Sequence, residues 1–164
     1  MLFRSPMHTA KPTEAQKEAG NYRMAHITIH GLEITIETPK GRARREGWPK
    51  MAAHYGYIKG TLGRDLDHVD VFVGPDRSRE LVYVIDQPSL GGRFDEHKCC
   101  IGFRSKEAAI AAYRDSYTVG WIIGKVTVMT IGQFKSWLAK GDQTKPIAPQ
   151  VAKYSQTAIA SNFA

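Results

Sequence analysis

The sequence has little cysteine and no long hydrophobic run, and each absence excludes a class of protein. Its 164 residues include two cysteines, the adjacent Cys99 and Cys100, which cannot form a disulfide framework. No apolar run approaches the roughly 18 residues that a membrane span needs, and no signal-type stretch lies near the start. Internal repeats and low-complexity segments are also lacking. We therefore expect a soluble, cytoplasmic protein with reduced thiols and no membrane association.

The charge is unbalanced, with a formal net value of +7. Such an excess is typical of proteins that bind nucleic acid, an acidic membrane surface or small anions. The basic residues are spread along the chain, and no basic helix with interleaved aromatic residues occurs. The densest basic group comprises Arg42, Arg44, Arg45 and Lys50, in a predicted loop. A small polyanion therefore fits the charge at least as well as a nucleic acid.

Short strands are predicted to come before two helices. Apolar and polar residues alternate on both sides of Gly31 within 25–38, which predicts two half-buried strands. Further strands are predicted at 55–58, 69–73, 81–85, 97–103 and 126–128. Ser105 is a suitable N-cap for a helix over 105–116, and the spacing of Thr130 and Gln133 predicts a capping box for a helix over 131–140.

This pattern predicts an α+β protein with a small closed or strongly curled sheet and helices packed outside it. We expect a polar N-terminal tail with a short helix over 1–20, one domain over 21–141, and a C-terminal extension over 142–164.

Three carboxylates fall within six residues where a loop enters a strand, at Asp65, Asp67 and Asp70. Clustered carboxylates resist being ionised together, and hard divalent cations with oxygen ligands relieve that repulsion. The pattern of a calcium EF-hand is absent. A solvated acidic turn is the alternative to a metal site on spacing alone.

A second charged group flanks a predicted hairpin loop. Asp86 ends one strand, and the run Asp95-Glu96-His97-Lys98 begins the next. Carboxylates beside a lysine suit a site that holds both metal and phosphate, because the carboxylates bind cations and the lysine neutralises phosphate oxygens. The alternative is a charged hairpin tip.

Two stretches together resemble the soluble family I inorganic pyrophosphatases. They are HYGYIKGTL at 54–62 and DLDHVDV at 65–71, and they are similar to the family's Asn-Tyr-Gly-Tyr-Ile, Thr-Leu and Asp-x-Asp-x-x-Asp signature. Ile36–Pro39, the residues Asp86, Glu96 and Lys98, the run Tyr113–Asp115 and Trp121 extend the similarity. The chain looks closest to a short, phage- and prophage-associated branch. Leu66 and His68 depart from the family's usual glycine and proline.

The resemblance implies a twisted, OB-like β-barrel flanked by two helices, and metal-dependent hydrolysis of pyrophosphate by an activated water. It implies two or more Mg²⁺ ions, with Mn²⁺ or Zn²⁺ as substitutes. Asp67 would be the general base, and Tyr55 would be a second catalytic residue that helps to hold the substrate. The implied metal ligands are Asp65, Asp70, Asp86, Asp95, Glu96 and Glu37. The implied substrate ligands are Lys98, Arg114 and Tyr113. The stretch between Glu37 and Tyr55 is shorter than in the family, so Arg44, Arg45 and Lys40 are only candidates for the family's phosphate-binding residues.

Three alternatives stay open at this point. The same site could hydrolyse a nucleotide phosphoanhydride, with Tyr113, Tyr117 and Trp121 as a shelf for the base. A zinc site could use His68, His97, Cys99 and Cys100, although neighbouring residues of a strand point to opposite faces. An inactive OB-like barrel could bind nucleic acid or protein, although the acidic cluster disfavours nucleic acid. The sequence also allows a homo-oligomer.

Overall fold

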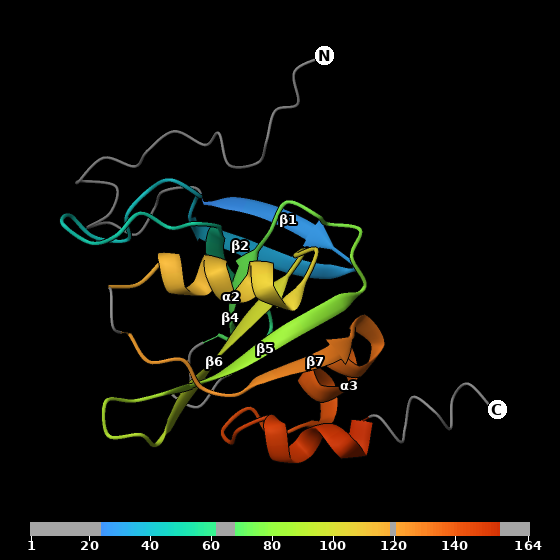
Figure 1. The fold of residues 1–164 in the computed structure, drawn as a ribbon. Coiled ribbons are helices and arrows are strands. Elements are labelled where there is room, and N and C mark those ends of the chain that lie inside the picture. The colour runs from blue at the N-terminus through green and yellow to red at the C-terminus, as the bar shows by residue number, and fades with distance from the viewer. Residues whose placement is uncertain (1–23, 62–67, 119–120, 155–164) are drawn as a thin grey trace.

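The computed structural model describes residues 24–61, 68–118 and 121–154 of the chain. Seven strands form one twisted sheet, and the helices pack on its two faces (Figure 1). The strands are β1 (Ala25–Ile29), β2 (Leu32–Thr38), β3 (His54–Ile58), β4 (Asp70–Val73), β5 (Leu81–Pro88), β6 (Phe94–Ile101) and β7 (Val126–Thr130). The helices are α2 (Lys106–Asp115), α3 (Ile131–Lys140) and the short 3₁₀ helix η2 (Ala148–Gln150).

The sheet is mixed and open. Its strand order is β1-β2-β3-β4-β6-β5-β7, and every neighbouring pair is antiparallel except β4 with β6. Among the described strands β1 and β7 are the two edges. The predicted α+β class is confirmed, whereas closure of the sheet into an OB-like barrel is not.

Each face of the sheet carries its own hydrophobic core, because successive strand residues point to opposite faces. On the α2 face, Tyr55, Phe72 and Cys100 pack against Ala109 and Tyr113 of α2. The α3 face buries the alternate strand residues, among them Val71, Val82, Val84, Cys99 and Ile101, with Phe134 and Trp137 of α3.

Both helices begin where the sequence predicts. The Ser105 side chain accepts a hydrogen bond from the backbone N–H of Ala108. At α3 the Thr130 hydroxyl accepts from the backbone N–H of Gln133, whose side-chain oxygen accepts from the backbone N–H of Thr130. The predicted capping box is therefore confirmed, and it fixes the junction between β7 and α3.

Residues 142–154 pack against the α3 face. Ile147 is fully buried and Tyr154 nearly so, and both belong to the core that contains Trp137. The Gln150 side chain donates hydrogen bonds to backbone carbonyls of this segment, including that of Pro146. The described part of the segment that the sequence set apart as an extension thus contributes to the core. Within the described residues no helix is long and apolar enough to cross a membrane.

Candidate active site

A buried ammonium group lies at the centre of the α2 face. Lys98 Nζ is 2.6 Å from the Tyr55 hydroxyl oxygen, 2.6 Å from Asp70 Oδ2 and 2.7 Å from Glu96 Oε1. The Tyr55 hydroxyl in turn donates to Asp70 Oδ2 at 2.8 Å. An ammonium group has three N–H donors, so Lys98 uses all three in contacts with these protein groups. We call Lys98, Asp70, Glu96 and Tyr55 the lysine cluster.

The register of three strands brings the lysine cluster together. Asp70 of β4 pairs in parallel with Lys98 of β6 and antiparallel with Tyr57 of β3. Glu96 and Lys98 are two residues apart, so both point to the α2 face. Gly56 lets β3 approach β2 closely, because a Cβ atom there would overlap the Thr35 carbonyl oxygen.

The lysine cluster holds more negative than positive charge. Two carboxylates face one ammonium group, and Glu96 and Lys98 have exposed side-chain fractions of 25% and 3%. Burial opposes the charge of Lys98, but the neighbouring Tyr55, Tyr117, Asp70 and Glu96 raise its pKa well above the usual value. Burial raises the pKa of Glu96, against the effect of Lys98. Two carboxylates around one ammonium group can attract a further cation.

A cavity of about 310 Å³ opens beside the lysine cluster. We call it the inner cavity. It is lined by Arg44, Trp48, Pro49, Met51, Gln87, Asp95, Glu96, Lys98, Ser116, Tyr117, Thr118 and Trp121. Carboxylates, a lysine and an arginine thus border one space that a small anion with its cations can enter.

Arg44 supplies an exposed positive charge to the inner cavity. Its guanidinium carbon lies 4.7 Å from the centre of the Tyr55 ring and 6.0 Å from that of Trp48. Among the described residues no carboxylate pairs with Arg44. A guanidinium group can bind phosphate oxygens in pairs, and Arg44 brings such a group to the wall of the inner cavity.

A chain of hydrogen bonds supports the cavity from α2. Trp121 Nε1 donates to the Tyr113 hydroxyl at 3.0 Å, and that hydroxyl donates to Gln87 Oε1 at 2.8 Å. Gln87 Nε2 lies 3.5 Å from Glu96 Oε1, at the long end of a hydrogen bond. Tyr113 is fully buried, so it orients the cavity wall and is not open to a substrate.

The two aspartates predicted to be a metal ligand and the general base, Asp65 and Asp67, lie outside the described residues. Residues on either side of them are joined at the end of β4 that carries Asp70. The Thr61 hydroxyl accepts from the backbone N–H of Val69 at 2.9 Å, and His68 Nδ1 lies 3.0 Å from the Thr61 carbonyl oxygen.

Asp86 does not join the lysine cluster. It pairs with His97 across β5 and β6, so both side chains point to the α3 face, opposite Lys98. Its two carboxylate oxygens accept hydrogen bonds from the backbone N–H groups of Ile147 and Ala148, at 2.9 and 3.1 Å. The sequence grouped Asp86 with Glu96 because both flank one hairpin, but the strand register separates them.

The other predicted ligands are dispersed. Glu37 is exposed, beside an irregularity in the pairing of β2 with β3, and the Lys40 backbone N–H donates to His54 Nδ1. Arg45 lies 5.0 Å from the centre of the Trp48 ring. Arg114 is exposed in the last turn of α2 and does not line the inner cavity.

The zinc alternative gains no support from the described residues. Cys99 belongs to the α3-face core and Cys100 to the α2-face core, as expected for neighbours on a strand. Burial raises the pKa of Cys100 to about 12 and that of Cys99 as well, which disfavours the thiolates that zinc needs. In the described part of the chain no three acidic, histidine or cysteine side chains converge on a metal position.

Sequence reasoning did not identify Gln87, Trp48, Ser116 and Thr118 as cavity residues. The alternation of β5 carried the signal for Gln87, since it lies two residues beyond Ile85 on the α2 face. The alternation could not be extended to Gln87, because the sequence predicted a loop from that residue, whereas β5 continues to Pro88.

The α+β fold carries an inner cavity that is bordered by carboxylates, a lysine and an arginine. The sequence model of the inorganic pyrophosphatase family matches residues 14–139. The chain therefore belongs to the inorganic pyrophosphatase family, which suggests a hydrolase that acts on pyrophosphate. The search of curated proteins and the search of solved structures gave no match.

Proposed function

We propose that this protein hydrolyses inorganic pyrophosphate to phosphate in the inner cavity. The observation that carries the proposal is the lysine cluster, in which Lys98 holds two carboxylates at the edge of a cavity that Arg44 also lines. Membership of the inorganic pyrophosphatase family supplies the reaction.

A divalent cation fits the chemistry of the carboxylates present. Asp70 and Glu96 outnumber Lys98 in charge, and Asp95 adds a further carboxylate to the cavity wall. These oxygens are the hard ligands that Mg²⁺ prefers, with Mn²⁺ or Zn²⁺ as substitutes. Because no three described carboxylates converge on one point, we assign the metal site to Asp70 and Glu96 together with Asp65 from the signature, with Asp67 beside them as the base. When bound, the metal lowers the pKa of a water and neutralises phosphate charge.

The protein's own residues divide the remaining tasks. Asp67 takes a proton from the attacking water, whose oxygen bonds to one phosphorus while the bridging P–O bond breaks and its electron pair leaves with the second phosphate. Arg44 binds phosphate oxygens from the open side of the cavity. Lys98 has no spare donor, so it positions Asp70 and Glu96 and holds the Tyr55 hydroxyl.

The finer features implied by the resemblance belong to the same proposal. They are the use of two or more Mg²⁺ ions and the phage-associated branch; the cytoplasmic location, expected from the composition, belongs to the proposal too. Closure of the sheet into an OB-like barrel is not needed for this site, since β3, β4 and β6 alone carry the lysine cluster.

Phosphate release from pyrophosphate tests the proposal. Activity should vanish in EDTA and return with Mg²⁺. Asp67→Asn should lower kcat by about 10²–10⁴, the usual contribution of a general base. Asp115→Asn removes an exposed carboxylate at the end of α2 and should leave kcat unchanged.

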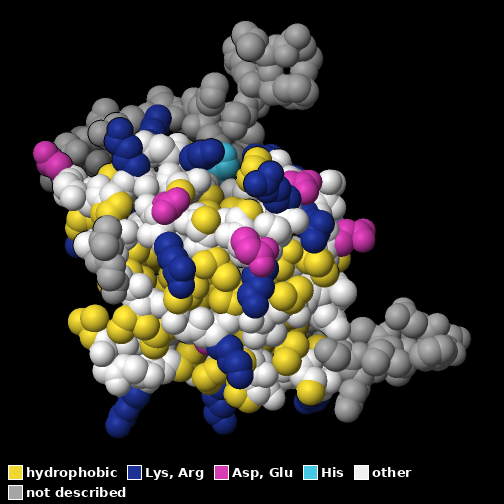
Figure 2. Space-filling view, viewed as in Figure 1, with side chains coloured by type: hydrophobic (Ala, Val, Ile, Leu, Met, Phe, Trp, Pro, Cys, Tyr) yellow, Lys and Arg dark blue, Asp and Glu magenta, His cyan; other side chains and the backbone are white. Residues whose placement is uncertain are grey.

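Full activity in EDTA would contradict the metal site. Absence of hydrolysis with Mg²⁺, Mn²⁺ and Zn²⁺, together with salt-dependent binding of nucleic acid, would favour the inactive binding module instead. The view in Figure 2 gives that alternative no support, because Lys and Arg side chains are distributed over this face and do not gather in one patch.

A further inference from the structure

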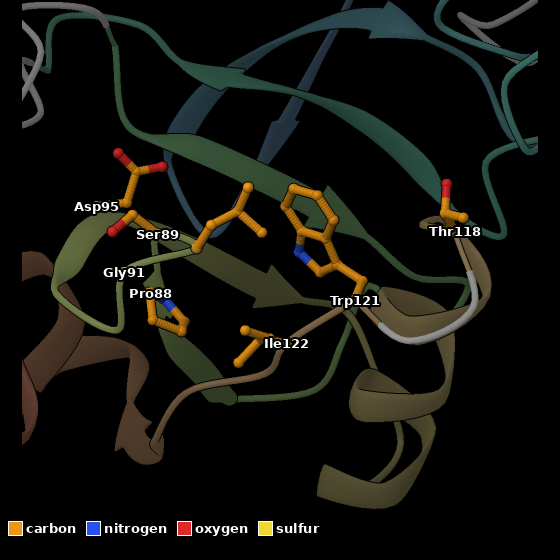
Figure 3. A pocket seen from close by; sticks show the side chains of 8 residues that line it. Pro88, Ser89, Gly91, Asp95, Thr118, Trp121 and Ile122 are labelled. Carbon is orange, nitrogen blue, oxygen red and sulfur yellow. The ribbon is translucent and has the colours of Figure 1, made fainter.

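A second cavity adjoins the inner one and is used by no step of pyrophosphate hydrolysis. Its volume is about 610 Å³, and we call it the outer pocket. It is lined by Pro88, Ser89, Leu90, Gly91, Asp95, Thr118, Trp121 and Ile122 (Figure 3). Asp95, Thr118 and Trp121 line both cavities, so a ligand of two parts can occupy them together.

The wall of the outer pocket is apolar and unusually exposed. Leu90, Trp121 and Ile122 have exposed fractions of 89%, 42% and 45%, which makes them three of the five large hydrophobic residues exposed in the described part of the chain. Figure 3 shows Pro88, Trp121 and Ile122 around a common space. Apolar residues that gather at a concave surface are typical of a binding site.

The indole of Trp121 is held in place before any ligand arrives. It stacks on the Tyr117 ring, with centres 5.0 Å apart and planes at 9°, and its N–H donates to Tyr113. Tyr117 thus covers part of the indole, while the side chain still borders the outer pocket. A fixed, flat aromatic surface binds another flat group at low entropic cost.

The polar groups define the rest of the ligand. In the inner cavity, Arg44 suits a phosphate group, and the Glu96 carboxylate beside Lys98 suits the cations of that phosphate. Around the outer pocket, Asp95 offers a hydrogen-bond acceptor, and Ser89 and Thr118 offer hydroxyl groups. The matching ligand carries phosphates at one end and a flat apolar group with N–H donors at the other. Nucleobases with amino groups have that chemistry.

We propose that the outer pocket binds the base of a nucleoside 5′-polyphosphate whose terminal anhydride is hydrolysed in the inner cavity. This inference rests on the proposed function, because it uses the same hydrolytic centre. The water oxygen bonds to the terminal phosphorus, the bridging P–O bond breaks, and the shortened nucleotide leaves with the electron pair. The proton of the water passes to the same base as in pyrophosphate hydrolysis.

Steady-state kinetics with pyrophosphate, ATP, GTP, CTP and UTP test the inference. Trp121→Ala should raise KM for the nucleotides by roughly ten- to hundredfold, the scale of a base–aromatic stack. The rise for pyrophosphate should be far smaller. Trp121→Phe keeps a ring but loses the hydrogen bond to Tyr113, so it should retain most of the nucleotide affinity.

Two further variants separate the pocket from general damage. The double variant Leu90→Ser with Ile122→Ser changes residues that line the outer pocket alone, and should raise KM for nucleotides more than KM for pyrophosphate. Val128→Ser changes an exposed apolar residue of β7 outside both cavities and should alter neither.

The outcomes distinguish the two proposals. Hydrolysis of pyrophosphate without hydrolysis of any nucleotide, and without inhibition by one, overturns this inference and leaves the proposed function intact. Hydrolysis of neither substrate with Mg²⁺, Mn²⁺ or Zn²⁺ overturns both. Nucleotide hydrolysis that the pocket variants affect no more than Val128→Ser does overturns the assignment of the base to this pocket.

Discussion

His97 and Lys98 are neighbours on β6, yet their surroundings on the two faces of the sheet differ. Lys98 faces α2, where two carboxylates and a tyrosine surround it beside an open cavity. His97 faces α3, where it packs between the rings of Phe94 and Trp137 with Asp86 Oδ1 3.4 Å from its Nε2. One strand therefore carries a candidate catalytic cluster on one side and a structural contact on the other.

The comparison teaches that buried charge has two uses in this molecule. On the α2 face the carboxylates exceed the cation and border solvent, so they can exchange partners with a ligand. On the α3 face the Asp86 carboxylate is satisfied by two backbone N–H groups, and it secures the segment around Ile147 and Ala148. Of these carboxylates, only those on the α2 face therefore have oxygen atoms that can bind a ligand.

Replacement of the buried lysine should have the largest effect. Lys98→Met leaves Asp70 and Glu96 without their counterion, and breaking a buried pair costs about 3–5 kcal/mol of unfolding free energy. Phosphate release should be lost as well. Urea unfolding in EDTA measures the stability, and Lys59→Met, at an exposed lysine after β3, is the control. Equal stability of the two variants would show that Lys98 does not hold the cluster together.

Removal of the Asp86 carboxylate on the α3 face should lower stability without lowering activity. Asp86→Ala leaves the backbone N–H groups of Ile147 and Ala148 unpaired, at a cost of about 1–3 kcal/mol for a buried donor without a partner. Thermal unfolding and phosphate release should show lower stability with an unchanged kcat. Asp86→Asn keeps one acceptor and should fall between the wild type and Asp86→Ala. A large loss of kcat in Asp86→Asn would return Asp86 to the active site.

The sequence predicted the strands and helices better than it predicted the arrangement of the strands in the sheet. Alternation in 25–38 and the capping residues Ser105 and Thr130 report local structure, so the strands and helices could be placed from them. The strand order could not, because the parallel pairing of β4 with β6 depends on contacts between distant segments. Asp86 and His97 pair within the β5–β6 hairpin, but the sequence ended the first strand of that hairpin too early, and a shift of one residue exchanges the faces.

The candidate site was likewise predicted only in part. The resemblance identified Tyr55, Asp70 and Lys98, which the structure brings into contact. The outer pocket depends on Leu90 of the β5–β6 loop and Ile122 of the segment before β7 lining the same cavity. No spacing within the sequence reports that juxtaposition.

The smallest expected effect is a pH dependence that belongs to the α3 face. Burial lowers the pKa of His97 to about 4, from an ordinary value of 6.5. Between pH 6.5 and 4, His97 binds a proton in the unfolded chain but stays neutral in the folded protein. The free energy of unfolding is therefore unaffected by His97 above pH 6.5 and falls as the pH is lowered from 6.5 toward 4.

Urea unfolding at pH 6.5 and 5.5 measures this effect. The free energy of unfolding should fall by about 1 kcal/mol over that interval, since one proton contributes at most about 1.4 kcal/mol per pH unit. His97→Gln should flatten the dependence, whereas His26→Gln, at an exposed histidine of β1, should leave it unchanged. Burial raises the pKa of Asp86, which acts in the opposite direction as that carboxylate takes up its proton. An undiminished dependence in His97→Gln would therefore assign the titration to another group and leave the contact on the α3 face without a role in acid sensitivity.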